Sequence, residues 1–300
     1  MPQVFDMADD TSCELAECAE AIGANGWDAR DEESTAAAAI WLKRLANNRD
    51  FLGDFLIHQL ESQYRKNVVE SGYGPQAIVL SPLSNGTFLR ANIWPSEQDH
   101  CYQASGAKTF VYGVPHDHNF SFLTVGYLGP GYRSDYYEYV YEDVAGYAGE
   151  ECELKFIERS ALHEGKLMLY RAHKDIHSQL TPEKLSISIN VMTVDTALSW
   201  YDQYGFDLEE QRVERVLSPN STEAFLRVAI ATGHESALDL AEQFGRNHPS
   251  DRLRLASFEA RSLLQEDAAA RDALWREAEL SGSRMLEGVA KTRRAALALS

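Results

Sequence analysis

The spacing of apolar residues changes twice along the chain and divides it into three stretches. In the first stretch, apolar residues recur near helical spacing among good helix formers, with few breakers. These residues are Ile40, Leu42, Leu45, Phe51, Phe55, Leu56 and Leu60. The pattern predicts an N-terminal helical segment over residues 1–72.

In the second stretch, residues 73–200, short apolar runs alternate with Gly, Pro, Asn, Asp and Ser. The runs are QAIVL, TFLRANIW, KTFVYGV, FSFLTVGYL, DYYEYVYE, ELKFIER, KLMLYRA and LSISINVMTV. Runs of this length, bounded by turn residues, predict strands. Many short strands in succession are typical of an antiparallel β sandwich or barrel.

The third stretch, residues 201–300, returns to a helical pattern, with segments that begin at cap-like residues or end at Gly. It predicts short antiparallel helices. The segment ATGHESALDLAEQFGRNHPSDRLRLASFEA resembles a HEAT-type helical repeat, in which helix hairpins stack on one another. The resemblance implies a surface for a protein or peptide partner, whereas a plain helical bundle would only brace the β domain. Together the three stretches predict an α+β protein.

Composition limits the function classes. Hydrophobic content is 44% and charged content 25%, and no apolar segment approaches the roughly 18 residues of a membrane span. The first residues lack an export signal, which favours a cytoplasmic location. Four cysteines without a CxxC pair are expected to be reduced thiols.

The net charge is −18, and no Lys/Arg cluster could follow a phosphate backbone. We therefore expect neither a nucleic-acid partner nor a membrane. The chain also lacks a P-loop, a GxGxxG motif and a GxSxG elbow, so the sequence does not support a phosphate cradle or a serine hydrolase.

The chemistry-bearing stretch is YGVPHDHNFSFLTVGYL, with His116 and His118 two residues apart before an apolar run. In extended backbone, both imidazoles project from one face and Asp117 from the other. Phe120, Phe122 and Thr124 continue the histidine face. Two imidazoles on one face suit a single metal ion, although a pair of ordinary polar side chains would show the same spacing.

A metal site needs a third ligand, and GKLMLYRAHKDIH supplies His173 and His177 in the link between two predicted strands. GVPHDH, followed by Gly165, Arg171, His173 and His177, resembles the two motifs of the cupin superfamily. This resemblance implies a cupin-type antiparallel β-barrel at residues 73–200. It also implies metal ligands His116, His118 and His177, with His173 at the usual turn-glycine position.

The glutamate ligand common in that family is missing, because Phe122 and Leu123 hold its place. The chain therefore resembles the three-histidine, cysteine dioxygenase-like branch. That branch implies mononuclear non-heme Fe(II), which oxidises a small amino-acid-like or peptide-borne substrate with O₂. Three imidazoles alone do not distinguish Fe(II) from Zn, Mn or Ni.

Other features of the branch are absent. Its Ser-x-His-x-Tyr relay falls on Ser186, Ser188 and Asn190, and its crosslinking cysteine falls on Leu123, so cysteine itself is not the expected substrate. Arg90 is expected to orient an acidic group of the substrate, or else to be a structural arginine.

Glu138 lies in RSDYYEYVYED and has two interpretations. Either Tyr137, Tyr139 and Tyr141 pack while Glu138 faces solvent, or Glu138 faces the metal as a displaced fourth ligand. The first is favoured, since carboxylates are seldom buried without a partner.

The sequence therefore predicts an iron-dependent cupin oxygenase. Two other functions stay open. One is a non-redox metal cupin that acts as an isomerase, epimerase or lyase, and the other is a metal-binding adaptor whose helical part binds a protein or peptide. Cupins often pair through barrel edges, so a homodimer is compatible with this reading.

Overall fold

The computed structural model describes residues 1–66, 76–194, 200–218 and 221–299. The chain forms two compact units, one of Met1–Tyr141 with Glu153–Leu198 and one of Glu142–Cys152 with Ser199–Ser300. The predicted boundary between residues 72 and 73 lies outside the described residues. In the part of the chain that is described, no helix is long and apolar enough to cross a membrane.

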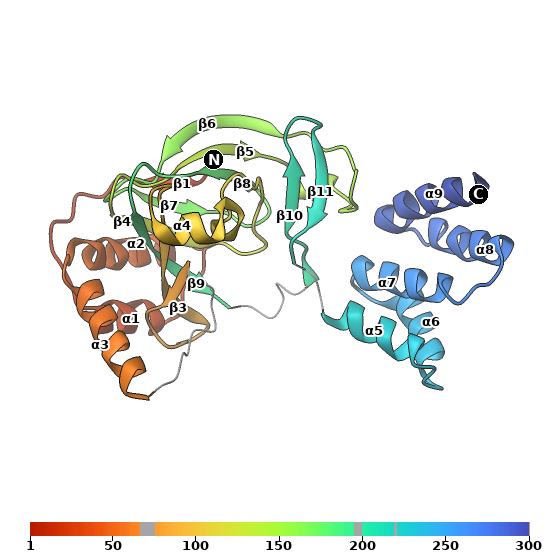
Figure 1. The fold of residues 1–300 in the computed structure, drawn as a ribbon. Coiled ribbons are helices and arrows are strands. Elements are labelled where there is room, and N and C mark those ends of the chain that lie inside the picture. Colours follow the sequence, from red (N-terminus) through yellow and green to blue (C-terminus); the bar gives the residue numbers. More distant parts are fainter. Residues whose placement is uncertain (67–75, 195–199, 219–220, 300) are drawn as a thin grey trace. The chain divides into compact units, whose positions relative to one another are not determined.

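The first unit contains two antiparallel sheets (Figure 1). The larger has the strand order β1-β7-β4-β9-β3-β2, and the smaller has the order β6-β5-β8. The strands of the larger sheet are β1 (Gln3–Phe5), β2 (Ala77–Val79), β3 (Thr87–Trp94), β4 (Phe122–Leu128), β7 (Leu167–Tyr170) and β9 (Ser186–Thr193). Those of the smaller are β5 (Arg133–Glu138), β6 (Lys155–Ala161) and β8 (Asp175–Leu180). Among the described residues, no continuous ladder of strand pairs closes the two sheets into a barrel.

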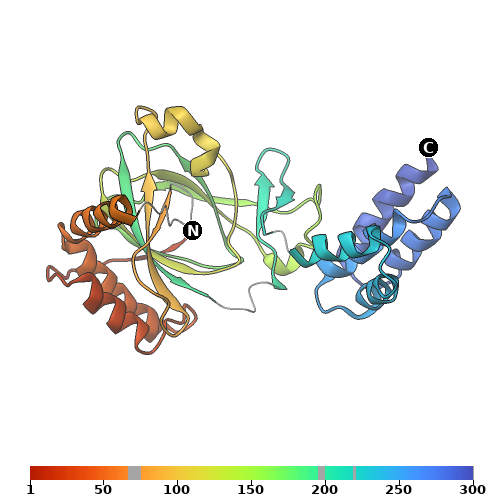
Figure 2. The ribbon, with the colours of Figure 1, turned by 60° about the horizontal axis from the view of Figure 1, so that its bottom comes forward.

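Three N-terminal helices cover one face of the larger sheet: α1 (Leu15–Gly23), α2 (Glu32–Asn47) and α3 (Phe51–Lys66). They gather on one side of this unit (Figure 2). Leu42 and Leu45 of α2 pack in one buried cluster with Leu123 and Val125 of β4. This face of the sheet, called the outer face below, is apolar because alternate strand residues all point into the helical layer.

The opposite face, called the inner face below, carries the side chains of the intervening strand positions, which point away from the helices. Phe122 and Tyr170 belong to a second, largely aromatic cluster, together with Tyr132 and Tyr136 from the segment that leads into and along β5. The two faces thus divide each strand by the two-residue period of β structure.

Two predictions for this unit are wrong. KTFVYGV forms the short 3₁₀ helix η1 (Ala107–Phe110), followed by Val111 at φ 62°, instead of a strand. Its aromatic residues Phe110 and Tyr112 are buried in the inner cluster, and this tertiary packing overrides a high β-propensity. The N-terminal stretch is also not wholly helical, because β1 pairs with β7 through Gln3–Leu169 and its neighbours.

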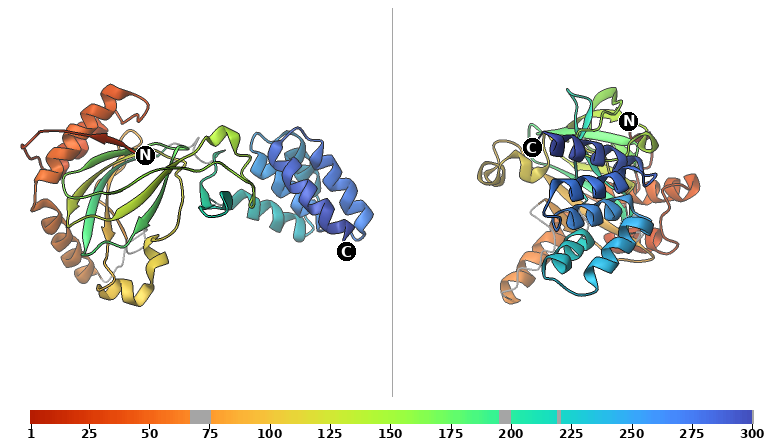
Figure 3. Two further views of the ribbon diagram at one scale, coloured as in Figure 1. Left: turned by 90° about the horizontal axis from the view of Figure 1, so that it is seen from above. Right: turned by 90° about the vertical axis from the view of Figure 1, so that its right-hand side faces the viewer.

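The second unit contains five described helices, as the sequence predicts. They are α5 (Ser221–Ala231), α6 (Ala237–Asn247), α7 (Asp251–Ser262), α8 (Ala268–Glu279) and α9 (Arg284–Ala298). The helices pack side by side (Figure 3). Four are preceded by Ser236, Ser250, Asp267 and Ser283.

Three of these four residues accept a hydrogen bond from a backbone N–H of the first helical turn, as in a regular N-cap. The sequence did not predict the hairpin of β10 (Tyr204–Asp207) and β11 (Arg212–Val216). N-terminal helices, antiparallel sheets and a C-terminal helical region confirm the α+β class.

Candidate metal centre

The backbone brings the three predicted ligands together where residues 113–118 run beside β8. His116 and His177 form an isolated antiparallel bridge, with N–O distances of 3.1 and 2.9 Å. Gly113 donates to Gln179 O at 2.9 Å, and His173 N donates to His118 O at 2.9 Å. His177 therefore lies on strand β8 and not in the link between strands, which corrects the sequence prediction.

The imidazoles converge through their Nε2 atoms. His118 Nε2 lies 3.0 Å and His116 Nε2 lies 3.2 Å from His177 Nε2. The potential ligand atoms of the three residues all lie within 4.8 Å of one another. Two nitrogens bound about 2.1 Å from one ion at angles of roughly 90–110° lie about 3.0–3.4 Å apart. The donor set therefore fits a single metal ion.

One of the three tautomers is set by the backbone. His116 Nδ1 lies 2.7 Å from the carbonyl oxygen of Val114, so Nδ1 carries the proton and donates it. Nε2 then holds a free lone pair directed at the other two rings. Such an orienting bond is usual behind a metal-bound histidine.

Burial keeps all three rings neutral. It lowers the pKa of His116 and lowers the pKa of His118 and His177 well below the usual value. The neighbouring imidazoles lower the pKa of His118 and His177 further, and the charge of Arg90 does the same for His118. Neutral imidazole is the form that binds metals, so the cluster is ready for a ligand role at neutral pH.

His173 does not belong to the group. It has φ 59° in the turn between β7 and β8, and its ring lies 4.2 Å from that of Tyr141. The turn is held by Asp175, which accepts hydrogen bonds from the backbone N and the guanidinium of Arg171. His173 thus occupies a left-handed turn position, the conformation for which a glycine is normally used.

The two acidic residues near the histidines have other partners. Asp117 is fully buried and accepts a hydrogen bond from Tyr139 Oη at 2.5 Å. Glu138 accepts one from Arg171 Nη2 at 2.8 Å and pairs with the Met1 ammonium group. Burial raises the pKa of Glu138, but these two cations outweigh it and the pKa lies below its usual value. Among the described residues, the group of converging ligand atoms contains no carboxylate.

Aromatic rings surround the histidines. The ring centroids of Phe120 and Phe122 lie 4.9 and 5.0 Å from that of His118, and the ring centroid of Tyr170 lies 4.9 Å from that of His177. Tyr170 Oη is 2.9 Å from Tyr136 Oη. The phenols are buried, and burial raises the pKa of Tyr170 far above its usual value, so its hydroxyl stays protonated.

Sequence reasoning missed this tyrosine group, which also includes Tyr132, with its Oη 3.5 Å from Tyr170 Oη. The signal was weak but present. Tyr170 ends the run KLMLY on the face opposite the outer-face residues Leu167 and Leu169. Tyr136 lies directly across from His177 in the β5–β8 register.

Arg90 lies on the inner face of β3, opposite Asn190 of β9. Burial lowers the pKa of His118 and raises the pKa of Tyr132, and the charge of Arg90 adds a smaller contribution that lowers both. Arg90 thus acts electrostatically on His118, whereas Glu138, the last residue of β5, is engaged by Arg171.

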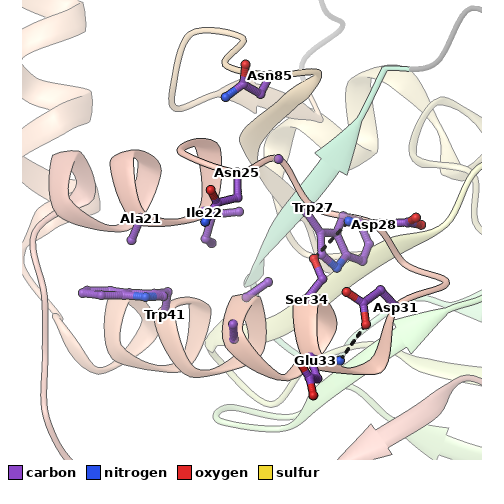
Figure 4. A pocket seen from close by; sticks show the side chains of 13 residues that line it. Ala21, Ile22, Asn25, Trp27, Asp28, Asp31, Glu33, Ser34, Trp41 and Asn85 are labelled. Carbon is purple, nitrogen blue, oxygen red and sulfur yellow. Dashed lines mark hydrogen bonds between the residues drawn. The ribbon is translucent and has the colours of Figure 1, made fainter.

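A separate hollow of about 690 Å³ lies against α1 and α2 (Figure 4). Trp41, Asp31 and Ser34 are among its lining residues, and none of the three histidines is. Its polar groups have structural partners: Asp31 accepts a hydrogen bond from Glu33 N at the start of α2, and Trp27 Nε1 donates to Thr35.

Comparisons with known proteins found only distant similarity to solved structures. Neither a family model nor a curated protein matches the chain. Among solved structures, one described as hydroquinone 1,2-dioxygenase PnpCD in complex with Cd2+ and 4-hydroxybenzonitrile is 10% identical, with a TM-score of 0.25. The match covers 42% of this chain and 69% of that chain.

A second solved structure, of prolyl 4-hydroxylases from Phytophthora capsici, is 8% identical over 91% of this chain and 77% of that chain, with a TM-score of 0.25. Similarity at this level does not indicate a function for this chain.

Proposed function

We propose that this protein is a mononuclear non-heme Fe(II) oxygenase of the three-histidine type, with His116, His118 and His177 as the metal ligands. The observation that carries the proposal is the convergence of three Nε2 atoms, with those of His118 and His116 at 3.0 and 3.2 Å from that of His177. Three neutral imidazoles whose Nε2 atoms face one another form a donor set of the kind that binds a metal ion. A metal ion satisfies all three lone pairs at once.

We also propose that the two sheets are the walls of a cupin-type barrel. The supporting feature is the path of residues 113–128. This segment pairs with β8 of the smaller sheet through the His116–His177 bridge and then becomes β4 of the larger sheet. The histidine pair lies at the point where the chain passes from one wall to the other.

The chain's own residues have distinct roles in this proposal. The three histidines hold the ion, and iron, when bound, supplies redox chemistry with O₂ at coordination positions that the protein leaves open. Phe120 and Phe122 shield part of the His118 ring from water, because their rings pack against it. Arg90 orients an acidic group of the substrate from the inner face of β3.

Glu138 is proposed to act on the metal site indirectly, through Arg171. It binds Arg171, whose guanidinium also binds Asp175, the first residue of β8. We assign Glu138 a positioning role: it holds the turn that places β8, and with it His177. Glu138→Gln should lower metal affinity less than loss of any ligand histidine.

The test combines metal analysis with a probe of the open positions. Anaerobic protein is loaded with Fe(II), its iron content is measured, and nitric oxide is added as an O₂ surrogate whose complex with high-spin Fe(II) has a characteristic EPR spectrum. One iron per chain and that spectrum are expected. Stoichiometric zinc in protein from the native host, with reaction rates equal in air and argon, would favour the non-redox alternative and reject the oxygenase.

A further inference from the structure

A row of polar side chains crosses the inner face of the larger sheet. Thr124 of β4 is opposite Asn190 of β9, and Asn190 is opposite Arg90 of β3. Cross-strand partners project from the same face, so these three residues form one line, called the inner polar row. Adjacent members are about 4.8 Å apart in the direction of strand pairing.

One line of cross-strand partners separates the row from the histidine cluster. The next line towards the histidines contains Phe122, which is opposite Met192. The ring of Phe122 lies 5.0 Å from that of His118. Since residues two apart in a strand are separated by about 7 Å, a molecule of a few carbon atoms spans the distance from the row to the histidines.

Two polar atoms on this face, Thr124 Oγ1 and Asn92 Oδ1, lack a partner among the described residues. Thr124 is 1% exposed, and its Oγ1 has no hydrogen-bond partner among the described residues. The same holds within that part of the chain for Asn92 Oδ1, which lies two residues beyond Arg90 on β3. A buried polar atom without a partner costs free energy, and such atoms in a native protein call for a ligand or water to pair with them.

Solvent reaches this face from the β3 side. Arg90 and Asn92 are partly exposed, whereas their outer-face neighbours Leu89 and Ala91 are at most 1% exposed. The histidines show the same gradient, because His118 is partly exposed while His116 and His177 are buried. The more exposed members of the row and of the cluster, Arg90 and His118, are therefore where a small molecule would approach.

The chemistry of the row selects a class of molecule. A guanidinium beside a carboxamide binds a carboxylate. Asn92 Oδ1 can only accept a hydrogen bond, whereas Thr124 Oγ1 can both donate and accept, and a hydroxyl group on the ligand, itself donor and acceptor, can pair with either atom. An ammonium group could donate as well, but it would lie near Arg90, and the fully described strands β3, β4 and β9 carry no aspartate or glutamate to neutralise it.

From these features we infer that the substrate is a small 2-hydroxy carboxylate, with its carboxylate on Arg90 and Asn190 and its hydroxyl group on Thr124. The inference rests on the proposed function for the meaning of the adjacent metal site, but its binding test does not. It also separates this chain from enzymes that act on amino acids, because the row disfavours a charged amine.

Ligand selectivity is tested with a matched set of three-carbon acids. Binding of racemic lactate, propionate, alanine and pyruvate to the full chain is measured by calorimetry, both after chelator treatment and after Fe(II) loading. Lactate is expected to bind about tenfold more tightly than each of the others, the gain from one added hydrogen bond to a buried partner. Equal binding of alanine, propionate or pyruvate would overturn the inference.

A second test uses the missing partner of Thr124. Thr124→Val removes the unpaired hydroxyl at nearly constant volume, so the unfolding midpoint of the ligand-free protein should rise by about 2 °C. The same change should weaken lactate binding about tenfold and leave propionate binding unchanged. A structural threonine would behave in the opposite way.

Thr35→Val is the matched control. Thr35 is also buried, at 3% exposure, but its Oγ1 accepts from Trp27 Nε1 and donates to Asp28 O. Its substitution should lower the unfolding midpoint and leave lactate binding unchanged. A lower midpoint in Thr124→Val, or unchanged lactate binding, would overturn the assignment of Thr124.

Metal content separates the two proposals. If lactate binds only to the Fe(II)-loaded protein, and equally to Thr124→Val, the metal alone holds it, and the polar row fails while the oxygenase proposal stands. If the protein binds no metal yet retains lactate selectivity that Thr124→Val abolishes, the proposed function fails and the row stands.

Discussion

The two faces of the larger sheet are built from the same strands but serve different ends. On the outer face Leu89, Leu123, Ile189 and Val191 are at most 1% exposed and pack against the N-terminal helices. On the inner face, alternate positions of the same strands hold arginine, asparagine, threonine and aromatic residues.

The difference shows where the free energy of folding is gained and where it is spent. Burying an aliphatic side chain contributes about 1.5–3 kcal/mol, so the outer face stabilises the unit. Thr124, on the inner face, is as buried as Leu89 but has no partner among the described residues, which costs stability. A polar residue kept at such a position is expected to act on a ligand.

The largest expected effect is loss of metal from the inner face. His177→Ala removes a ligand that two other imidazoles approach at 3.0 and 3.2 Å. Metal affinity should fall by at least about a thousandfold, roughly 4 kcal/mol, since even changes behind the ligands cost 10–100-fold. Mass spectrometry of the intact protein and elemental analysis would measure it.

His173→Asn is the control for that experiment. Asparagine tolerates the left-handed backbone of residue 173, at φ 59°, so the turn should survive. This variant should keep most of its metal. Metal loss in His173→Asn together with retention in His177→Ala would show that the ligand set is wrong.

Much of this contrast could be predicted from the sequence. The two-residue period of β structure placed His116, His118, Phe122 and Thr124 on one face, and the structure has Phe122 and Thr124 on the inner face of β4, with the ring of His118 against that of Phe122. Local spacing was enough there because the residues are neighbours in one segment.

What could not be predicted depends on strand pairing between distant segments. Tyr170 and Tyr136 lie on different strands, and only the fold brings their hydroxyls to 2.9 Å. The row formed by Thr124, Asn190 and Arg90 likewise needs the register of three strands. A one-residue shift would send those side chains to the other face, and the sequence alone does not specify that register.

The next effect belongs to the outer face. Leu123→Ala removes a fully buried side chain from the core beneath α2 and should cost about 3 kcal/mol of unfolding free energy. Its metal content, measured under native conditions, should stay at one ion per chain, because the side chain points away from the histidines. Chemical denaturation monitored by tryptophan fluorescence gives the free energy. Loss of metal from the folded variant would mean that the faces are not independent.

The free energy of unfolding should fall in mild acid because of the three histidines beside the inner face. The three histidines have lowered pKa values in the folded protein, mainly through burial, so the unfolded chain binds more protons below about pH 6.5. Their contribution is complete above that pH and is lost as pH falls, at about 1.4 kcal/mol per pH unit for each histidine.

Denaturation of chelator-treated protein at several pH values tests this slope. Asp9, paired with Arg44 of α2, has a pKa of about 2 and stays ionised in that window, so it does not contribute. Replacing His118 by glutamine should reduce the slope between pH 6.5 and 5. An unchanged slope in this variant would show that His118 takes up protons equally in the folded and the unfolded chain.

The smallest effect concerns the tyrosines beside the histidines. Tyr170→Phe deletes the hydroxyl 2.9 Å from Tyr136 Oη but keeps the ring stacked on Phe122 at 4.4 Å, so stability should fall by only about 1 kcal/mol. Tyr112→Phe, which loses a 2.9 Å bond to Pro95 O, should cost a similar amount. If the phenol also donates a hydrogen bond to a molecule at the metal, only Tyr170→Phe should alter the EPR spectrum of the Fe(II)–nitric oxide complex. Identical spectra for both variants would limit Tyr170 to packing and leave ligand recognition to the inner polar row.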